Sequence, residues 1–143
     1  MDAPRRPLRR VALSSPRRGL SPITAREYAN DMEPHSKLWL EQNGKLALSD
    51  YRVRLLRLID ETGSLSEAAA AMQLSYRRAW GKLREIEQNL GLKLVETVVG
   101  GAGGGGSRLT AEGRRLIERY EQFRVAAEQD VAKQFARAFE REP

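Results

Sequence analysis

The sequence predicts a mainly α-helical protein with a small β-wing and a long C-terminal helix. Residues 50–90 contain three segments with helical apolar spacing, separated by short turns. Two β-prone runs, residues 92–99 and 107–110, then flank a glycine-rich loop. From residue 111 to about residue 139, apolar residues recur at spacings of three and four, which is typical of one long helix. A helix, a short helix, a tight turn, a third helix and a hairpin together predict a winged helix-turn-helix.

The first patterned segment, residues 37–48, predicts a β-hairpin that leads into the first helix. It reads KLWLEQNGKLAL, and an Asn43-Gly44 pair between alternating apolar runs is the strongest two-residue hairpin signal. Asp50 is expected to cap the helix that follows, and Gly63 is expected to end it. Apolar residues with helical spacing lie between them: Val53, Leu55, Leu56, Leu58 and Ile59.

The second and third helices are predicted from their caps. Ser64 and Glu67 form a capping box before an alanine-rich run, which predicts a short second helix. Ser75 is expected to cap the third helix, and Gly91 is expected to end it as a left-handed C′ residue. One face of this helix forms a core stripe: Ala79, Leu83, Ile86 and Leu90.

The opposite face of the third helix has an unfavourable charge order. Arg77 and Arg78 occupy the first turn, where the helix dipole favours Asp or Glu, and Glu85 and Glu87 occupy the second half. One interpretation is a solvated polar face whose charge order has no role. The other is that an anion binds at this N-terminus, where arginines and free backbone N–H groups both serve it. Trp80 is expected to pack against the first helix, whereas Tyr76 is equally placed to pack or to reach a base.

The glycine-rich loop is the feature most easily mistaken for an enzyme motif. Gly101, Gly103 and Gly106 match G-x-G-x-x-G, but no second strand follows to complete a βαβ unit, and Ser107-Arg108 stands where a P-loop has Lys followed by Ser or Thr. The loop is therefore interpreted as the tip of the wing, where glycine lets the backbone approach DNA closely. The expected wing-loop residues are Gly100, Gly101, Gly103, Gly104, Gly105 and Gly106.

Composition narrows the class of partner. The chain has 25 basic and 19 acidic residues, a net charge of +6, no cysteine and a single histidine. A basic balance favours nucleic acid or a membrane surface, although many basic domains bind neither. The lack of cysteine excludes a thiolate metal site, and one histidine excludes histidine-based catalysis, so we expect no metal, no cofactor and no enzyme. No apolar run reaches the roughly 18 residues of a membrane span.

The last helix predicts a homodimer. Its apolar positions run close to a heptad seam that no other segment of the chain is long enough to cover. Partial packing on its own domain is the alternative. The expected dimerisation residues are Leu116, Tyr120, Phe123, Ala127, Val131 and Phe135.

The chain is expected to divide into three parts. Residues 1–35 form a disordered basic arm, because paired arginines, scattered prolines and the scarcity of acidic residues argue against a stable helix. Met32 is an alternative start, in which case most of this arm is an artefact. Residues 36–110 form the winged helix-turn-helix DNA-binding domain, and residues 111–143 form the dimerisation helix.

The segment SLSEAAAAMQLSYRRAWGKLREIEQNLGLKLVET resembles the LysR-type helix-turn-helix along its whole length. The sequence is more closely similar to the N-terminal DNA-binding domain of the molybdate-responsive ModE family, in LSYRRAW at residues 74–80 and in the glycine run that leads into Leu109, Thr110 and Gly113. The resemblance covers about residues 37–131. It implies a dimeric transcriptional regulator whose third helix enters the major groove, and by analogy regulation of molybdenum or anion uptake genes.

Two departures from the family limit what the resemblance implies. The similarity does not extend to the oxyanion-binding domains of full-length members, so we expect no molybdate binding by these residues and leave the effector unknown. Ala102 stands at the wing tip, where the family can place a basic residue, so no ionic contact is expected from the tip.

The function predicted from all this is sequence-specific binding of double-stranded operator DNA by a homodimeric regulator in the bacterial cytoplasm, associated with the nucleoid. The alternative is a winged-helix protein-interaction module without DNA specificity. The expected DNA-binding residues are Ser75, Tyr76, Arg77, Arg78, Gly81, Lys82, Arg84, Lys93 and Arg108.

Overall fold

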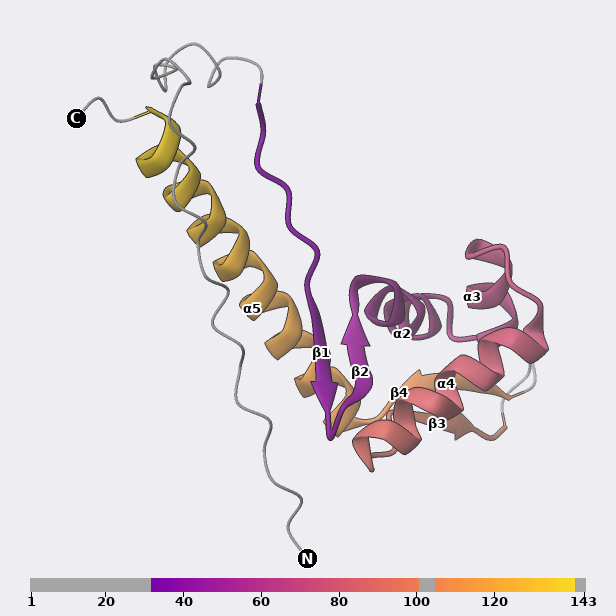
Figure 1. Ribbon diagram of the computed structural model, residues 1–143. Helices are drawn as coiled ribbons and strands as arrows, with labels where there is room; N and C mark the ends of the chain where they lie inside the picture. The colour runs from indigo at the N-terminus through magenta and orange to yellow at the C-terminus, as the bar shows by residue number, and fades with distance from the viewer. Residues whose placement is uncertain (1–31, 101–104, 141–143) are drawn as a thin grey trace, which may run out of the picture.

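The computed structural model describes residues 32–100 and 105–140. Its elements are β1 (Trp39–Gln42), β2 (Lys45–Ser49), α2 (Asp50–Thr62), α3 (Leu65–Ala71), α4 (Tyr76–Leu90), β3 (Val95–Val98), β4 (Gly106–Leu109) and α5 (Ala111–Phe135), and a π-helical turn, Ala136–Glu140, continues α5. Two antiparallel hairpins, β1–β2 and β3–β4, accompany the helices, and α5 projects away from the body that the other elements form (Figure 1). The winged helix-turn-helix prediction is therefore confirmed. Most of the expected basic arm, residues 1–31, lies outside the described residues.

The helix boundaries follow from local capping, and one predicted cap is wrong. Ser49 caps α2, because its extended backbone lets its hydroxyl accept a hydrogen bond from the Arg52 N–H at 3.3 Å. Asp50 is instead the first helical residue, and its carboxylate binds α5. The other predicted caps are confirmed: Ser64 and Ser75 each accept from the backbone N–H three residues on, and Gly63 and Gly91 adopt left-handed φ values of 70° and 66°. Thr110 caps α5 in the same way, by accepting from the Gly113 N–H.

The core lies between the three short helices and is closed by the wing and by the first turns of α5. The predicted stripe on α4 is confirmed for Ala79, Leu83 and Ile86, which are buried, whereas Leu90 is half-buried at the edge of the core. Fully buried large side chains come from five elements and one loop: Leu48, Leu55, Leu56, Ile59, Ile86, Leu94, Leu109 and Ile117. At roughly 1.5–3 kcal/mol for each large apolar side chain, this burial is the main stabilising term for so small a domain.

The first hairpin is fixed to the helices by a buried arginine. Its turn is the predicted two-residue one, with left-handed φ values of 52° at Asn43 and 75° at Gly44. Arg52 on α2 donates to the Leu46 carbonyl at 2.6 Å and forms an ion pair with Glu85 on α4 at 3.0 Å. Asn89 donates to the same carbonyl at 2.8 Å. Glu85 therefore has a structural partner that its place in the sequence did not reveal.

The wing is attached through backbone contacts that require glycine. The Gly63 carbonyl accepts from the Ser107 N–H at 2.8 Å, and a Cβ added to Gly106 would lie 2.6 Å from that carbonyl oxygen. A Cβ on Gly105 would likewise meet the Val98 carbonyl oxygen at 2.8 Å. The assignment of Gly106 to the wing loop is therefore wrong, because Gly106 begins β4 and packs against the turn between α2 and α3. The expected tip residues 101–104 lie outside the described residues.

The first half of α5 is bound to α2, which corrects the predicted dimer seam. Tyr120 is buried in its own chain and donates to the Asp50 carboxylate at 2.6 Å, and Arg124 donates to the same oxygen at 2.6 Å. Arg57 donates to both carboxylate oxygens of Glu121, at 2.8 and 2.6 Å. Leu116 also packs against the core. Tyr120 and Leu116 therefore serve the fold of one chain and are removed from the seam.

These contacts shift the pKa values of the groups that join α2 to α5. The Arg124 guanidinium holds the pKa of Asp50 below its ordinary value. The Arg57 guanidinium does the same for Glu121. Burial, followed by the hydrogen bond to Asp50, raises the pKa of Tyr120. These shifts mean that the ionised carboxylates are the forms that hold α5 in place.

We predict opposite stability effects for alanine at the two glycines inside helices. A Cβ on Gly113 in α5 would lie 2.5 Å from the Leu94 carbonyl oxygen, so Gly113→Ala should lower the free energy of unfolding by about 1–3 kcal/mol. Gly81 in α4 has open space around it, so Gly81→Ala should raise this free energy by up to about 1 kcal/mol. Urea unfolding followed by circular dichroism measures both. Equal effects would contradict the close approach at Gly113.

We also predict that Asp50 contributes to stability in a defined pH range. A carboxyl group whose pKa is lowered by folding stabilises the native state above its unfolded pKa of about 4, and the stabilisation is lost as the pH falls through the folded pKa. Asp50→Asn should therefore unfold more easily than the unmodified chain at pH 7, and the difference should shrink steadily below about pH 4. Chemical unfolding of both proteins from pH 7 to pH 2 is the measurement. Asp130→Asn, an exposed change on α5, is the control and should show no such convergence.

Candidate nucleic-acid interface

The first turn of α4 forms a cationic surface at a helix N-terminus. Ser75 caps the helix by accepting from the Arg78 N–H at 3.2 Å, and the next three side chains, Tyr76, Arg77 and Arg78, are all exposed. The turn contains no acidic residue. Uncapped backbone N–H groups and the positive end of the helix dipole therefore lie beside two guanidinium groups, an arrangement suited to an anion.

The arginines of the described residues fall into two groups. One group joins elements or strands through ion pairs with carboxylates: Arg52, Arg57, Arg108, Arg114 and Arg124. Within residues 32–100 and 105–140, the arginines without an ion pair are Arg54, Arg77, Arg78, Arg84, Arg119 and Arg137, and three of these, Arg77, Arg78 and Arg84, lie on α4. Their charges are therefore available to an external anion.

The acidic residues of α4 bind neighbouring parts of the fold. Glu85 pairs with Arg52, and the Glu87 carboxylate accepts from the Leu94 N–H at 2.8 Å, where the chain leaves α4 for the wing. The unfavourable charge order along α4 thus has a physical reason. Its carboxylates hold neighbouring elements, and its N-terminal arginines have no partner of this kind in the described chain.

The flanks of α4 carry two cation–π contacts. The Lys82 ammonium lies 5.1 Å from the ring centre of Tyr51, and the Arg84 guanidinium lies 5.3 Å from that of Trp80. Trp80 is 48% exposed, so the expectation that it packs against the first helix is wrong. Gly81, beside it, is open to solvent.

The predicted wing cations differ in position from what was expected. Lys93 is exposed but precedes β3, so its assignment to a wing strand is wrong by two residues. Arg108 does lie on β4, where it faces Glu96 across the hairpin and donates to its carboxylate at 2.7 Å. Gly100 adopts a left-handed φ of 85° at the end of the described part of the wing loop.

The arrangement of these elements suits a long, polyanionic partner. The start of α4 and the loop end of the β3–β4 hairpin lie at the same end of the molecule, beside α3 (Figure 1). An α-helix fits the major groove of DNA, and an adjacent hairpin reaches the neighbouring phosphates. Among the described residues, no group of three His, Asp or Glu side chains is placed to hold a metal ion. None of the helices there has the length and apolarity of a membrane span.

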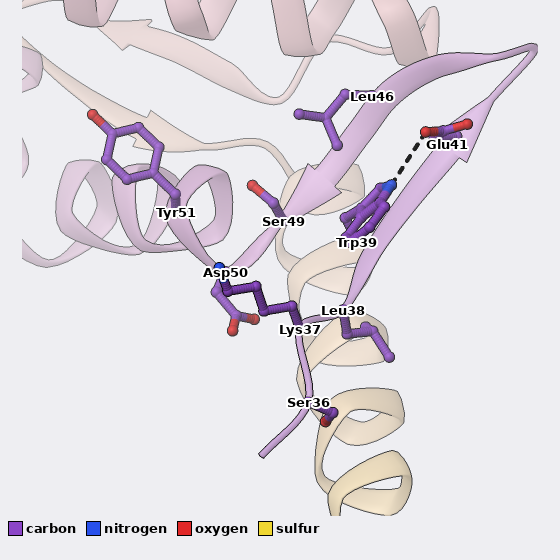
Figure 2. A pocket seen from close by; sticks show the side chains of 9 residues that line it. All are labelled: Ser36, Lys37, Leu38, Trp39, Glu41, Leu46, Ser49, Asp50 and Tyr51. Carbon is purple, nitrogen blue, oxygen red and sulfur yellow. Dashed lines mark hydrogen bonds between the residues drawn. The ribbon is translucent and has the colours of Figure 1, made fainter. Parts of the chain in front are cut away.

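A pocket of about 440 Å³ lies between the first hairpin and the start of α2, apart from this surface. Figure 2 shows Trp39 over it, with the indole N–H donating to Glu41 at 3.1 Å. Leu46 and Tyr51 also line it. Its charged lining residues are Lys37, Glu41 and Asp50, so it has no excess of positive charge and does not extend the cationic surface.

Comparison with known families shows which type of helix-turn-helix this segment matches. Residues 51–114 match the family described as bacterial regulatory helix-turn-helix protein, lysR family. These residues span α2 to the first turn of α5. The predicted resemblance to LysR-type proteins is confirmed.

Curated relatives carry the ModE name. The chain is 37% identical over 90 residues to the molybdenum transport protein ModE of Azotobacter vinelandii, covering 63% of this chain and 33% of the relative. It is 39% identical over 90 residues to the DNA-binding transcriptional dual regulator ModE of Escherichia coli K12, covering 63% and 34%. A molybdenum-pterin-binding protein, MopB of Rhodobacter capsulatus, is 42% identical over 69 residues, covering 48% and 26%. The chain thus spans about a third of the length of its ModE relatives.

Solved structures give a weaker likeness. A crystal structure of the CbnR DNA-binding domain in complex with DNA superposes with a TM-score of 0.49 at 21% identity, covering 64% of this chain and 99% of that one. A complex of the BenM DNA-binding domain with benA site 1 DNA gives 0.47 at 19% identity, covering 64% and 97%.

Proposed function

We propose that this LysR-type helix-turn-helix chain is a sequence-specific, DNA-binding transcriptional regulator in which α4 enters the major groove. The observation that carries the proposal is the first turn of α4, where exposed Arg77 and Arg78 sit at a helix N-terminus without an acidic residue. The names of the relatives support it, since several are transcriptional regulators and one is described as DNA-binding. Such a regulator acts on the bacterial chromosome, and hence in the cytoplasm at the nucleoid.

The energetics of this turn favour a functional reason for its arginines. A cation in the first turn of a helix costs roughly 0.3–1 kcal/mol, and the fold recovers none of this through a carboxylate partner in the described residues. A DNA phosphate at the same place reverses the sign, because it interacts favourably with the dipole and with both guanidinium groups.

The two arginines are assigned different roles. Ala79, Leu83 and Ile86 define the buried face of α4, and Arg77 points more squarely away from that face than Arg78 does. Arg77 is therefore placed to reach a guanine edge in the groove, and Arg78 to bind the backbone beside it. Ser75, Lys82 and Arg84 are further phosphate contacts, and Gly81 lets the groove approach closely. Lys93, just before β3, contacts the DNA backbone, and Arg108 on β4 does so on release from Glu96.

A protein-interaction module is the second candidate, and one observation favours it. Tyr76 and Trp80 are 56% and 48% exposed on α4, and exposed aromatic side chains are common anchors of protein interfaces. Selection of bound sites from a random DNA library separates the two functions. A regulator enriches a defined sequence, with affinity that falls as salt rises, whereas an interaction module enriches none.

We further propose that the regulator is a homodimer through the distal part of α5. Phe123 is 48% exposed, and Ala127, Val131 and Phe135 follow it at spacings of four on one face. Phe135 stacks on Phe139 with ring centres 4.8 Å apart, which extends the apolar end of the helix. Since α5 leaves the body after its contacts with α2, a second copy is the partner best able to cover this length (Figure 1).

We predict that Arg77→Ala and Arg78→Ala separate stability from DNA binding. Thermal stability should stay unchanged or rise slightly, because an unfavourable charge–dipole contact disappears. Arg77→Ala should weaken operator binding by about 1–3 kcal/mol and relax the preference at one base pair, whereas Arg78→Ala should weaken all sequences alike. Competition against single-base operator mutants measures this. Equal losses on every mutant for Arg77→Ala would reverse the assignment, and no loss for either variant would refute the proposed α4 interface.

We predict that charge on the distal seam dissociates the dimer. Phe123→Asp and Val131→Asp place unpaired carboxylates in the interface, at a cost of several kcal/mol per site. Val125→Asp is the matched control, since Val125 is 53% exposed and lies two residues along, on the other side of the helix. Sedimentation at micromolar concentration should show monomers for the first two variants and dimers for the control. An unmodified chain that sediments as a monomer would exclude the seam.

A further inference from the structure

Three exposed side chains on α4 form a stripe that neither the core nor a structural ion pair explains. Tyr76, Trp80 and Arg84 are spaced four residues apart and so lie on one face of the helix. All three are exposed, and the Arg84 guanidinium lies 5.3 Å from the centre of the indole ring. We call these residues the aromatic stripe. A tryptophan left 48% exposed at this position forgoes part of its burial energy, which suggests that a partner covers it.

The surroundings of the aromatic stripe identify the chemistry of that partner. Arg77 and Arg78 are exposed in the same turn as Tyr76, and Lys82 lies on the flank. An occupant must therefore be anionic at its edges and apolar where it meets the indole. Gly81 follows Trp80 in the same turn, and a Cβ built on it would have no atom within 4 Å, so no side chain obstructs a ligand on that part of the helix surface.

The major groove of DNA meets both requirements. Phosphates line its edges, and the C5-methyl group of thymine is the one apolar group that its floor presents. A carboxylate-rich protein surface would satisfy the arginines but would offer nothing specific to the indole. The charge complementarity and the exposed ring together therefore favour thymine-containing DNA.

We propose that Trp80 is a specificity-determining residue that recognises thymine through contact between its indole ring and the C5-methyl group. Arg84 is a positioning residue, because its cation–π contact restricts the indole to one orientation. This inference rests on the proposed function, since it requires that α4 enters the major groove. It adds an apolar contact with a base to an interface whose other proposed contacts are mainly charged.

Replacement of thymine by deoxyuridine tests the contact directly, because it removes only the methyl group. In a site selected from a random library, each thymine is replaced in turn and the dissociation constant is measured. The unmodified chain should lose affinity about fourfold at one or two positions, the value of one buried methyl group. Trp80→Ala should bind the thymine site more weakly and lose nothing further at those positions. Arg84→Ala should respond less to the replacement than the unmodified chain, and Arg84→Lys should recover part of the response.

The second tryptophan provides a matched control and a second measurement. Trp39 is 56% exposed on β1, and the chain contains two tryptophans, so Trp39→Phe should keep the full deoxyuridine response and leave Trp80 as the one fluorophore of its kind. The fluorescence emission of Trp80 should change on DNA binding, and its quenching by iodide should decrease. This measurement needs no substitution on α4, so it holds even if Trp80→Ala fails to fold.

The outcomes distinguish this inference from the proposed function. If the unmodified chain selects a site but responds to no deoxyuridine, or if Trp80→Ala keeps the full response, Trp80 does not read thymine although the regulator function stands. Unchanged iodide quenching in the DNA complex leads to the same conclusion. If the chain selects no sequence at all, the proposed function and this inference fail together.

Discussion

The positions of the wing and of α5 relative to the helix-turn-helix depend on two places where two backbone segments touch, because a glycine there has no side chain. At one, Gly106 brings β4 against the carbonyl of Gly63, and Ser107 donates to that oxygen. At the other, Gly113 brings the start of α5 against the carbonyl of Leu94, which also accepts from Thr110. These contacts fix the wing and α5 relative to the helix-turn-helix. A side chain at Gly106 would push β4 away from the turn between α2 and α3, and a side chain at Gly113 would push the start of α5 away from Leu94.

Some arginines stabilise the fold through ion pairs and others stay exposed, and this difference explains how a strongly basic chain keeps a defined fold. Arg52, Arg57 and Arg124 hold the first hairpin and α5 to the helices through carboxylates. Within the part of the chain that the structure describes, the arginines of the first turn of α4 lack such partners, as do some cations on other elements, such as Arg54 and Arg119. What sets Arg77 and Arg78 apart is their position at a helix N-terminus, where an anionic partner gains from the helix dipole as well as from their charges.

Local signals in the sequence were sufficient to predict the helices and the turns, and insufficient to predict long-range contacts. Caps such as Ser64 and Ser75 act within three residues, so they could be predicted. The burial of Tyr120 depends on Asp50, 70 residues away, and apolar spacing alone cannot separate such a residue from a dimer seam. Trp80 shows the opposite error, because it was expected to be packed and is exposed. An aromatic residue beside a core stripe has the pattern of a core residue, and only the structure reveals its exposure.

Because α5 is bound firmly to α2, the side chains of its distal half point in fixed directions relative to the rest of the domain. Asp50 and Arg57 of α2 bind Arg124 and Glu121 in its proximal half, so the distal half cannot turn independently of the body. In an α-helix each inserted residue rotates everything beyond it by about 100° and moves it by about 1.5 Å. A change in the length of α5 would therefore keep the orientation of its distal face only in steps of about seven residues, which restore the phase to within roughly 20°. In the proposed dimer, the length of α5 would set how far apart the two copies of the body are held.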